Sequence, residues 1–141
     1  LFFRQLSIDP SNPRWEDRDR FVLSKGHTAL GLYATLALRG YISEEELKTF
    51  DQFESRLQAH PDMTKLDALD MSTGSLGQGL SAAVGMAIGA KRLKKDFHVY
   101  CLIGDGESQE GQVWEAANIA EKYKLDNLIV IMDQNGLQKK R

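Results

Sequence analysis

Two apolar runs separated by an amphipathic stretch constrain the fold of this chain most strongly. Residues 98–103 (HVYCLI) and 127–132 (NLIVIM) are short runs without acidic or basic residues, as in buried strands. Between them, residues 111–124 (GQVWEAANIAEKYK) carry apolar side chains at helical spacing. A strand–helix–strand unit of this kind nearly always crosses over right-handed and makes its strands parallel neighbours. The sequence therefore predicts an α/β fold.

Two helices are predicted upstream of this unit. Over residues 27–39 the apolar side chains recur at helical spacing, and Gly40 follows where a left-handed C-cap is typical. Ser43 and Glu46 form a capping box, which predicts a second helix over residues 44–53.

A third helix is predicted over residues 76–93, a stretch rich in Ala and Gly that runs into the basic sequence KRLKK. Gly85 and Gly89 would each weaken a helix by roughly 1 kcal/mol relative to Ala, so we expect a close helix or backbone contact there. Residues 55–77 show no sustained period and predict a long loop. Loops of this length in compact domains tend to be functional.

Length and charge narrow the class of protein. A chain of 141 residues suits one domain, and we expect a single, partial domain over residues 1–141 with residues 1–20 as an entry loop. Lys and Arg total 18 against 20 acidic residues, which argues against a nucleic-acid partner. Residues 71–90 lack charge but contain many polar residues and glycines, so we expect no membrane span.

The single cysteine and the two ends bear on location and completeness. Cys101 lies within an apolar run, which favours a buried, inert thiol and fits a reducing cytoplasm. The first residues, LFFRQLS, have no sustained apolar region and do not resemble a signal peptide. Because the chain lacks an initiator Met and stops soon after a predicted strand, we expect a piece of a longer protein.

Asp105 follows the first of the two apolar strands directly, and Asn135 follows the second. The ends of neighbouring strands lie about 4.8 Å apart, and opposite oxygens around Mg²⁺ lie about 4 Å apart. One hard cation could therefore bridge Asp105, the Asn135 amide oxygen and a backbone carbonyl just beyond, at Leu137. Phosphate oxygens and water would complete its coordination.

Gly104 and Gly106 flank this aspartate. They permit unusual dihedral angles and a close approach of a diphosphate to the backbone, and the following helix would point its amides at the anion. Taken alone, a Gly-Asp-Gly string favours an ordinary turn, because such strings are common. GDGESQEG also lacks the lysine and hydroxyl residue of a Walker loop and the spacing of a dinucleotide-binding loop.

Five motifs together resemble one family. They are DRFVLSKGH from Asp19, HPDM from His60, STGSLGQGLSAAVGMA from Ser72, GDGESQEGQVWEA from Gly104 and DNLIVIMDQNGLQ from Asp126. In this order they resemble the amino-terminal thiamine-diphosphate (PP) domain of transketolase, over nearly the whole chain and most closely in its split bacterial form. The resemblance implies a three-layer fold with a mostly parallel sheet flanked by helices.

The resemblance also implies roles for cofactor ligands. Asp105, Asn135 and the Leu137 carbonyl would coordinate Mg²⁺, for which Ca²⁺ or Mn²⁺ can substitute. Gly104 and Gly106 would line the diphosphate of thiamine diphosphate.

Further roles follow from the motifs around the predicted loop. Gly74 and Leu76 resemble positions that hold the aminopyrimidine. His27 and His60 resemble histidines that reach the diphosphate and the donor sugar and that can move protons near neutral pH. Glu110 and Glu115 resemble acids at a dimer interface that link paired active sites. Without the other motifs, His27 could cap its helix, His60 could be an ordinary loop residue and Glu115 could complement a helix dipole.

The implied activity is transfer of a two-carbon ketol unit from a ketose phosphate to an aldose phosphate. The glutamate that activates the aminopyrimidine belongs to a pyrimidine-binding domain that this sequence lacks. The chain is therefore expected to be inactive alone and to need that partner, in a homodimer or heterotetramer. Alternatives are deoxyxylulose-phosphate synthase, the alpha subunit of a 2-oxo acid dehydrogenase, or a binding module that holds the cofactor without catalysis.

Overall fold

The computed structural model describes residues 1–137 of the chain, which form a parallel sheet between helices. The elements in chain order are β1 (Arg20–Leu23), η1 (Gly26–Thr28), α1 (Ala29–Leu38), η2 (Glu45–Thr49), α2 (Gln78–Leu93), β2 (Val99–Gly104), η3 (Gly106–Gln109), α3 (Gly111–Lys122) and β3 (Leu128–Asp133).

The sheet has the order β1-β2-β3, and both pairings are parallel. The strand–helix–strand prediction is confirmed, because β2, α3 and β3 follow one another and the two strands are neighbours. β1 was not predicted. It has only four residues, RFVL, and charged residues precede it, so no apolar run marks it in the sequence.

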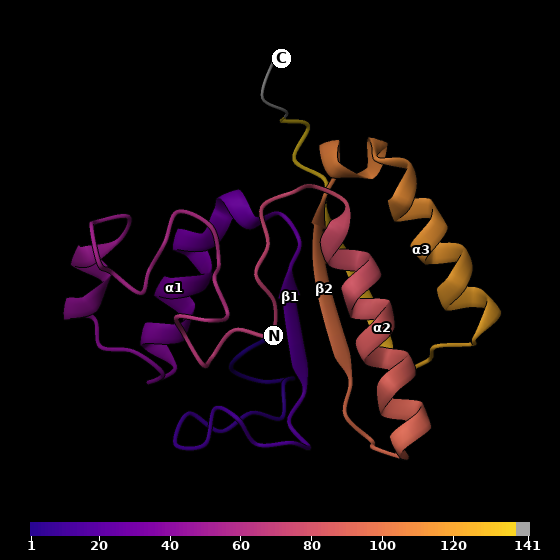
Figure 1. The fold of residues 1–141 in the computed structure, drawn as a ribbon, viewed down its shortest axis with the longest axis horizontal. Coiled ribbons are helices and arrows are strands. Elements are labelled where there is room, and N and C mark those ends of the chain that lie inside the picture. Colours follow the sequence, from indigo (N-terminus) through magenta and orange to yellow (C-terminus); the bar gives the residue numbers. More distant parts are fainter. Residues whose placement is uncertain (138–141) are drawn as a thin grey trace.

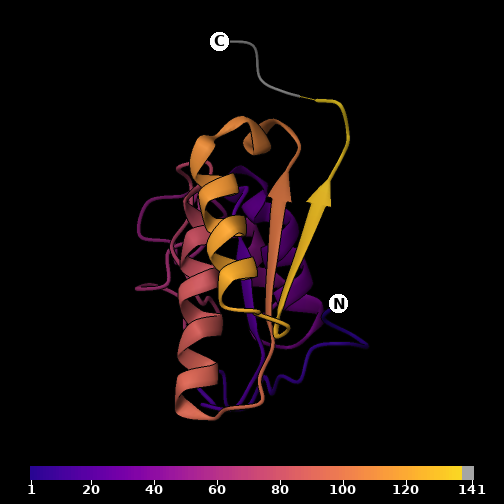
Figure 2. The ribbon, with the colours of Figure 1, turned by 90° about the vertical axis from the view of Figure 1, so that its right-hand side faces the viewer.

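Each face of the sheet carries its own apolar cluster, so the fold has the three layers expected. α2 and α3 cover one face, where Val99, Cys101 and Ile103 of β2 are buried. α1 covers the other face, where Leu23 of β1 and Leu57 of the long loop are buried in the second cluster. Figure 1 shows α1 on one side of the strands and α2 and α3 on the other, and Figure 2 shows α2 and α3 from the side.

The second predicted helix, over residues 44–53, is wrong in type and length. Only half of the capping box forms: the Glu46 amide donates to Ser43 Oγ at 3.2 Å, but the Glu46 carboxylate binds Arg56. Only the short 3-10 helix η2 follows. Asp51 has a φ of 57°, and its amide donates to the Leu57 carbonyl at 2.8 Å. This turn ends the helix because it brings Leu57 into the core.

The first and third helices are confirmed, with shifted starts. Gly40 has a φ of 85° after α1, as its predicted capping role requires. The close contact expected at Gly85 and Gly89 is wrong, since within residues 1–137 a Cβ built at either position has no heavy atom within 4 Å apart from the adjacent backbone of its own helix. The contact lies at Gly79 instead, where an added Cβ would stand 2.7 Å from Ser24 Cα.

The predicted long loop and the predicted burial of the Cys101 thiol are both confirmed. Residues 50–77 contain no helix or strand. Cys101 is fully buried, and this burial, with a smaller contribution from the Glu107 charge, raises its pKa to about 12. Among the described residues, no helix is both long and apolar enough to cross a membrane.

Candidate functional site

The carboxyl ends of β2 and β3 bring Asp105 beside the residues that follow β3. Gly104 and Asp133 are register partners, and the Asp105 amide donates to the Asp133 carbonyl at 3.2 Å. The Asp105 carboxylate accepts the Gly136 amide at 2.8 Å and the Gly106 amide at 2.9 Å. Gly136 has a φ of 68°, which lets the chain turn back toward Asp105.

The Asp105 carboxylate has no cationic partner among residues 1–137, where both of its bonds come from backbone amides. Asn135 precedes Gly136, whose amide binds this carboxylate. Asn135 Oδ1 accepts the Leu137 amide at 2.8 Å, and Asn135 Nδ2 donates to Asp133 Oδ2 at 3.1 Å. Asn135 and Leu137 are exposed. An uncompensated carboxylate beside an amide oxygen is a donor set that suits a hard divalent cation.

No group of three His, Cys, Asp or Glu side chains within residues 1–137 could enclose a metal ion. A cation at Asp105 would have one carboxylate and would need neutral oxygens, water and an anionic ligand to complete its coordination. The residues present fit that open kind of site.

The two glycines beside Asp105 do not adopt the unusual dihedral angles expected of them. Neither Gly104 nor Gly106 has a positive φ, because Gly104 ends β2 and Gly106 begins η3. A Cβ at Gly104 would meet only Glu107 Cβ, at 3.9 Å. What Gly104 provides is therefore an open backbone surface rather than a special conformation.

The turn from Ser24 to Gly26, between β1 and α1, contacts three segments at this edge: the residues after β2, the end of β3 and the long loop. Ser24 Oγ donates to Glu107 Oε1, and Lys25 Nζ donates to Asp133 Oδ2 at 2.5 Å. The hydrogen bond from Lys25 lowers the pKa of Asp133 below its ordinary value. A Cβ at Gly26 would lie 2.8 Å from the Gly74 amide nitrogen, so the turn also presses against the long loop.

Glu107 is a buried residue that sequence reasoning missed. Its exposed fraction is 2%, and its carboxylate accepts Ser24 Oγ, the Gly77 amide at 2.7 Å and the Gly104 amide at 3.1 Å. It therefore ties β1, the long loop and β2 together. Its position three residues after Gly104 was the only available signal, because its other partners are remote in the sequence.

The long loop brings further predicted residues to this edge. The His60 ring lies against Gly74, where an added Cβ would be 3.1 Å from His60 Cδ2. His27, next to Gly26, and His60 are both exposed. Leu76 is 36% exposed.

The loop ends beside the start of α3. A Cβ at Gly77, which has a φ of 86°, would be 2.9 Å from Glu110 Cβ, so Glu110 reaches the end of the loop. Glu115 is exposed on α3.

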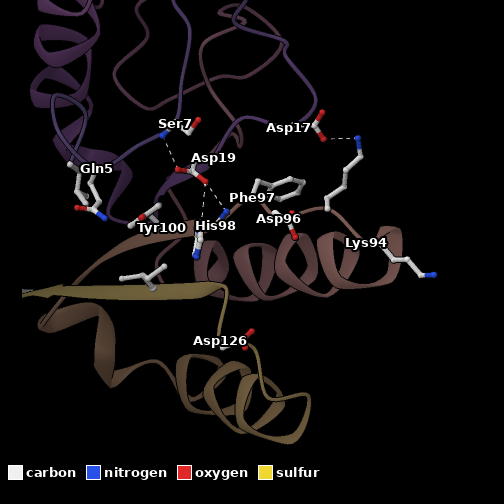
Figure 3. A pocket seen from close by; sticks show the side chains of 13 residues that line it. Gln5, Ser7, Asp17, Asp19, Lys94, Asp96, Phe97, His98, Tyr100 and Asp126 are labelled. Carbon is white, nitrogen blue, oxygen red and sulfur yellow. Dashed lines mark hydrogen bonds and ion pairs between the residues drawn. The ribbon is translucent and has the colours of Figure 1, made fainter.

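A cavity of about 920 Å³ lies at the opposite, amino edge of the sheet, and none of the predicted site residues lines it. Two of its carboxylates already have partners: Asp17 pairs with Lys95 at 2.6 Å, and Asp19 accepts the backbone amides of Ser7 and His98 (Figure 3). The predicted residues gather at the carboxyl edge instead.

Comparison with known proteins identifies the family. Residues 1–139 match the family described as transketolase, thiamine diphosphate binding domain. The chain belongs to the transketolase family. This match and the relatives below favour transketolase over the two other enzymes considered from the sequence.

Two curated transketolase relatives are similar over 138 residues. The 6-deoxy-6-sulfo-D-fructose transketolase subunit of Clostridium sp. (strain MSTE9) is 51% identical, over 98% of this chain and 50% of the relative. Human transketolase is 50% identical, over 97% of this chain and 22% of the relative. The chain thus spans about half the length of the first relative and about a fifth of the second.

Solved transketolase structures share the fold. The enzyme from Leishmania mexicana superposes with a TM-score of 0.94 at 36% identity, over 98% of this chain and 22% of that one. The enzyme from Campylobacter jejuni gives a TM-score of 0.90 at 43% identity, over 94% and 22%.

Proposed function

We propose that this chain binds thiamine diphosphate with Mg²⁺ at the carboxyl edge of its sheet, as one part of a transketolase. The observation that carries the proposal is the Asp105 carboxylate. It lies beside residues 135–137 and has only backbone amides as partners in the described chain. A carboxylate left without a counter-charge in this position favours a bound cation.

Asp105, the Asn135 amide oxygen and the Leu137 carbonyl would hold the metal, and Ca²⁺ or Mn²⁺ can replace Mg²⁺ there. Gly104 and Gly106 would lie against the diphosphate, and the metal would offset its charge. When bound, thiamine diphosphate supplies the carbon centre that carries a two-carbon ketol unit.

Residues from the long loop and from the turn after β1 would contact the aminopyrimidine, the diphosphate and the sugar. The backbone at Gly74 and Leu76 would hold the aminopyrimidine. His27 would contact the diphosphate, and His27 and His60 would hold or move protons at the sugar hydroxyls. Both imidazoles are exposed, as contact with a ligand requires.

Substrates and partners follow from the same role. The reaction would move a ketol unit between sugar phosphates, in the cytoplasm. The relatives include proteins named as transketolase subunits, which supports a pyrimidine-binding partner subunit or domain. The assembly would be a homodimer or a heterotetramer. Glu110 and Glu115 would face that partner and link paired active sites.

Calorimetric titration tests cofactor binding. We expect wild-type protein to bind thiamine diphosphate tightly only with Mg²⁺, and Asp105→Ala to lose most of the metal-dependent part. Asp67→Ala is the matched control, because Asp67 is an exposed carboxylate paired with Arg14. Equal metal-dependent binding by wild type and Asp105→Ala would refute the role of Asp105.

A ketol-transfer assay with the pyrimidine-binding partner tests the reaction. We expect activity only when both are present. If cofactor binds but every plausible partner leaves the mixture inactive, the chain is a binding module instead.

A further inference from the structure

We propose that Lys25 and Asp133 are positioning residues for the metal site, which orient the Asn135 side chain so that its amide oxygen is presented to the cation. This inference rests on the proposed function, because it concerns the same metal. The sequence motifs assign no role to either residue, and neither would touch the metal itself.

The ion pair between Lys25 and Asp133 is fixed by burial. Only 6% of the Lys25 side chain is exposed, and its Nζ lies 2.5 Å from Asp133 Oδ2. A buried ammonium group is costly without a partner, so Lys25 cannot readily leave this carboxylate. The pair joins the turn after β1 to the end of β3 across 108 positions of sequence.

The backbone of Lys25 is held on both sides. Ser24 is fully buried and donates to Glu107, and Gly26 packs against the backbone of residues 73 and 74. The ammonium group therefore approaches Asp133 from a rigid turn. Its position is set by the same contacts that build the rest of the edge.

Asp133 transmits this position to Asn135. The Oδ2 atom that accepts Lys25 also accepts Asn135 Nδ2 at 3.1 Å. A side-chain amide has a donor end and an acceptor end, so holding the nitrogen at Asp133 fixes where the oxygen points. Asn135 Oδ1 accepts one bond, from the Leu137 amide at 2.8 Å, and its second lone pair is available to a cation.

The same pair keeps Asp133 engaged. Asp133 lies two residues from Asn135, and a free carboxylate there would compete with the amide for the metal. With Lys25 and Asn135 both bound to Oδ2, the charge of Asp133 is compensated. The Asp105 carboxylate has no such cationic partner within residues 1–137. Partners that orient metal ligands typically change metal affinity by about 10- to 100-fold when they are removed.

The test measures Mg²⁺ affinity by calorimetric titration of Mg²⁺ into the complete subunit, assembled with its pyrimidine-binding partner and supplied with thiamine diphosphate. Lys25→Met and Asp133→Ala should each weaken Mg²⁺ binding about 10- to 100-fold. Lys91→Met is the matched control, because Lys91 pairs with Asp126 at 2.6 Å, away from this edge, and its affinity should equal that of wild type.

A double-mutant cycle separates positioning from a general structural role. If Asp133 acts through Asn135, Asp133→Ala should weaken Mg²⁺ binding in the wild-type background but add little to Asn135→Ala. Losses that multiply in the double variant would overturn the inference. Asp133→Asn should recover part of the affinity, because its amide oxygen can still accept both bonds.

The cycle remains decisive if Lys25→Met does not fold, because the Asp133 side chain is 44% exposed and tolerates truncation. Two failures can be told apart. If Asp105→Ala binds Mg²⁺ as tightly as wild type, the proposed function is wrong. If Asp105→Ala loses binding while Lys25→Met and Asp133→Ala do not, only the positioning role is wrong.

Discussion

The two edges of the sheet each hold an aspartate with backbone amide partners, and they differ in charge compensation. At the amino edge, Asp70 accepts the Phe21 amide at 2.8 Å and pairs with Arg18 at 2.6 Å, and both side chains are less than 10% exposed. At the carboxyl edge, Asp105 accepts two amides and has no cationic partner within residues 1–137.

This difference in charge compensation distinguishes a carboxylate that stabilises the fold, Asp70, from one that can bind a cation, Asp105. A buried acid that is paired with arginine completes its own interactions inside the fold, so removing it leaves a buried charge. An acid held only by backbone amides is oriented but not neutralised. The carboxylate that can still bind a cation is therefore Asp105 at the carboxyl edge, where open α/β sheets bind their ligands.

The largest expected effect is the loss of stability when the paired aspartate at the amino edge is removed. Asp70→Ala should lower the free energy of unfolding by about 3–5 kcal/mol, because it leaves the buried Arg18 guanidinium without its anionic partner. Asp105→Ala should lower it by about 1 kcal/mol at most, as for the loss of a helix cap. Urea unfolding measures both, with the exposed Asp67→Ala as control. Equal losses at positions 70 and 105 would contradict the distinction.

Glu107→Ala should be next in size, since it leaves the Ser24 hydroxyl and the amides of Gly77 and Gly104 without their acceptor. Each buried group left unsatisfied costs about 1–3 kcal/mol. Removing the buried carboxylate offsets part of that cost, so we expect a total loss of about 2–4 kcal/mol in urea unfolding. Glu115→Ala, an exposed glutamate on α3, is the control. Amide hydrogen exchange should speed up at Gly77 and Gly104 in the Glu107 variant, and unchanged protection there would argue against the three-way bridge.

The smallest effects come from two glycines that should respond in opposite directions. Gly77→Ala should destabilise the fold by about 1–2 kcal/mol, because its φ of 86° is unfavourable for Ala and its Cβ would crowd Glu110. Gly85→Ala should stabilise it by about 0.5–1 kcal/mol, because Gly85 lies inside α2 with nothing near an added Cβ. Thermal unfolding checks both signs, and destabilisation by Gly85→Ala would show a contact at that position.

The fold could be predicted where local pattern and packing agree. The β2–α3–β3 unit follows from two apolar runs and one amphipathic helix, and its parallel pairing places Asp105 beside residues 135–137. β1 could not be predicted, because four residues after a charged stretch carry no period. The helix predicted over residues 44–53 failed because burial of Leu57 overrides the local capping signal.

The site could be predicted only in part, for a physical reason. Asp105 directly follows β2 and Asn135 lies two residues after β3, so strand pairing locates both. Lys25 and Glu107 act through partners far away in the sequence, which no local pattern reveals. The conformations of the glycines could not be predicted from the sequence either. A positive φ occurs at Gly74, Gly77 and Gly136, and not at Gly104 or Gly106, which flank Asp105 in the sequence.

The most direct test of the central claim is a crystal structure of the protein with thiamine diphosphate and Mn²⁺, in which anomalous scattering locates the metal. We expect one strong peak in contact with an Asp105 carboxylate oxygen, the Asn135 amide oxygen and the Leu137 carbonyl. A peak among the acidic residues of the amino-edge cavity, or a bound metal that touches neither Asp105 nor Asn135, would contradict it.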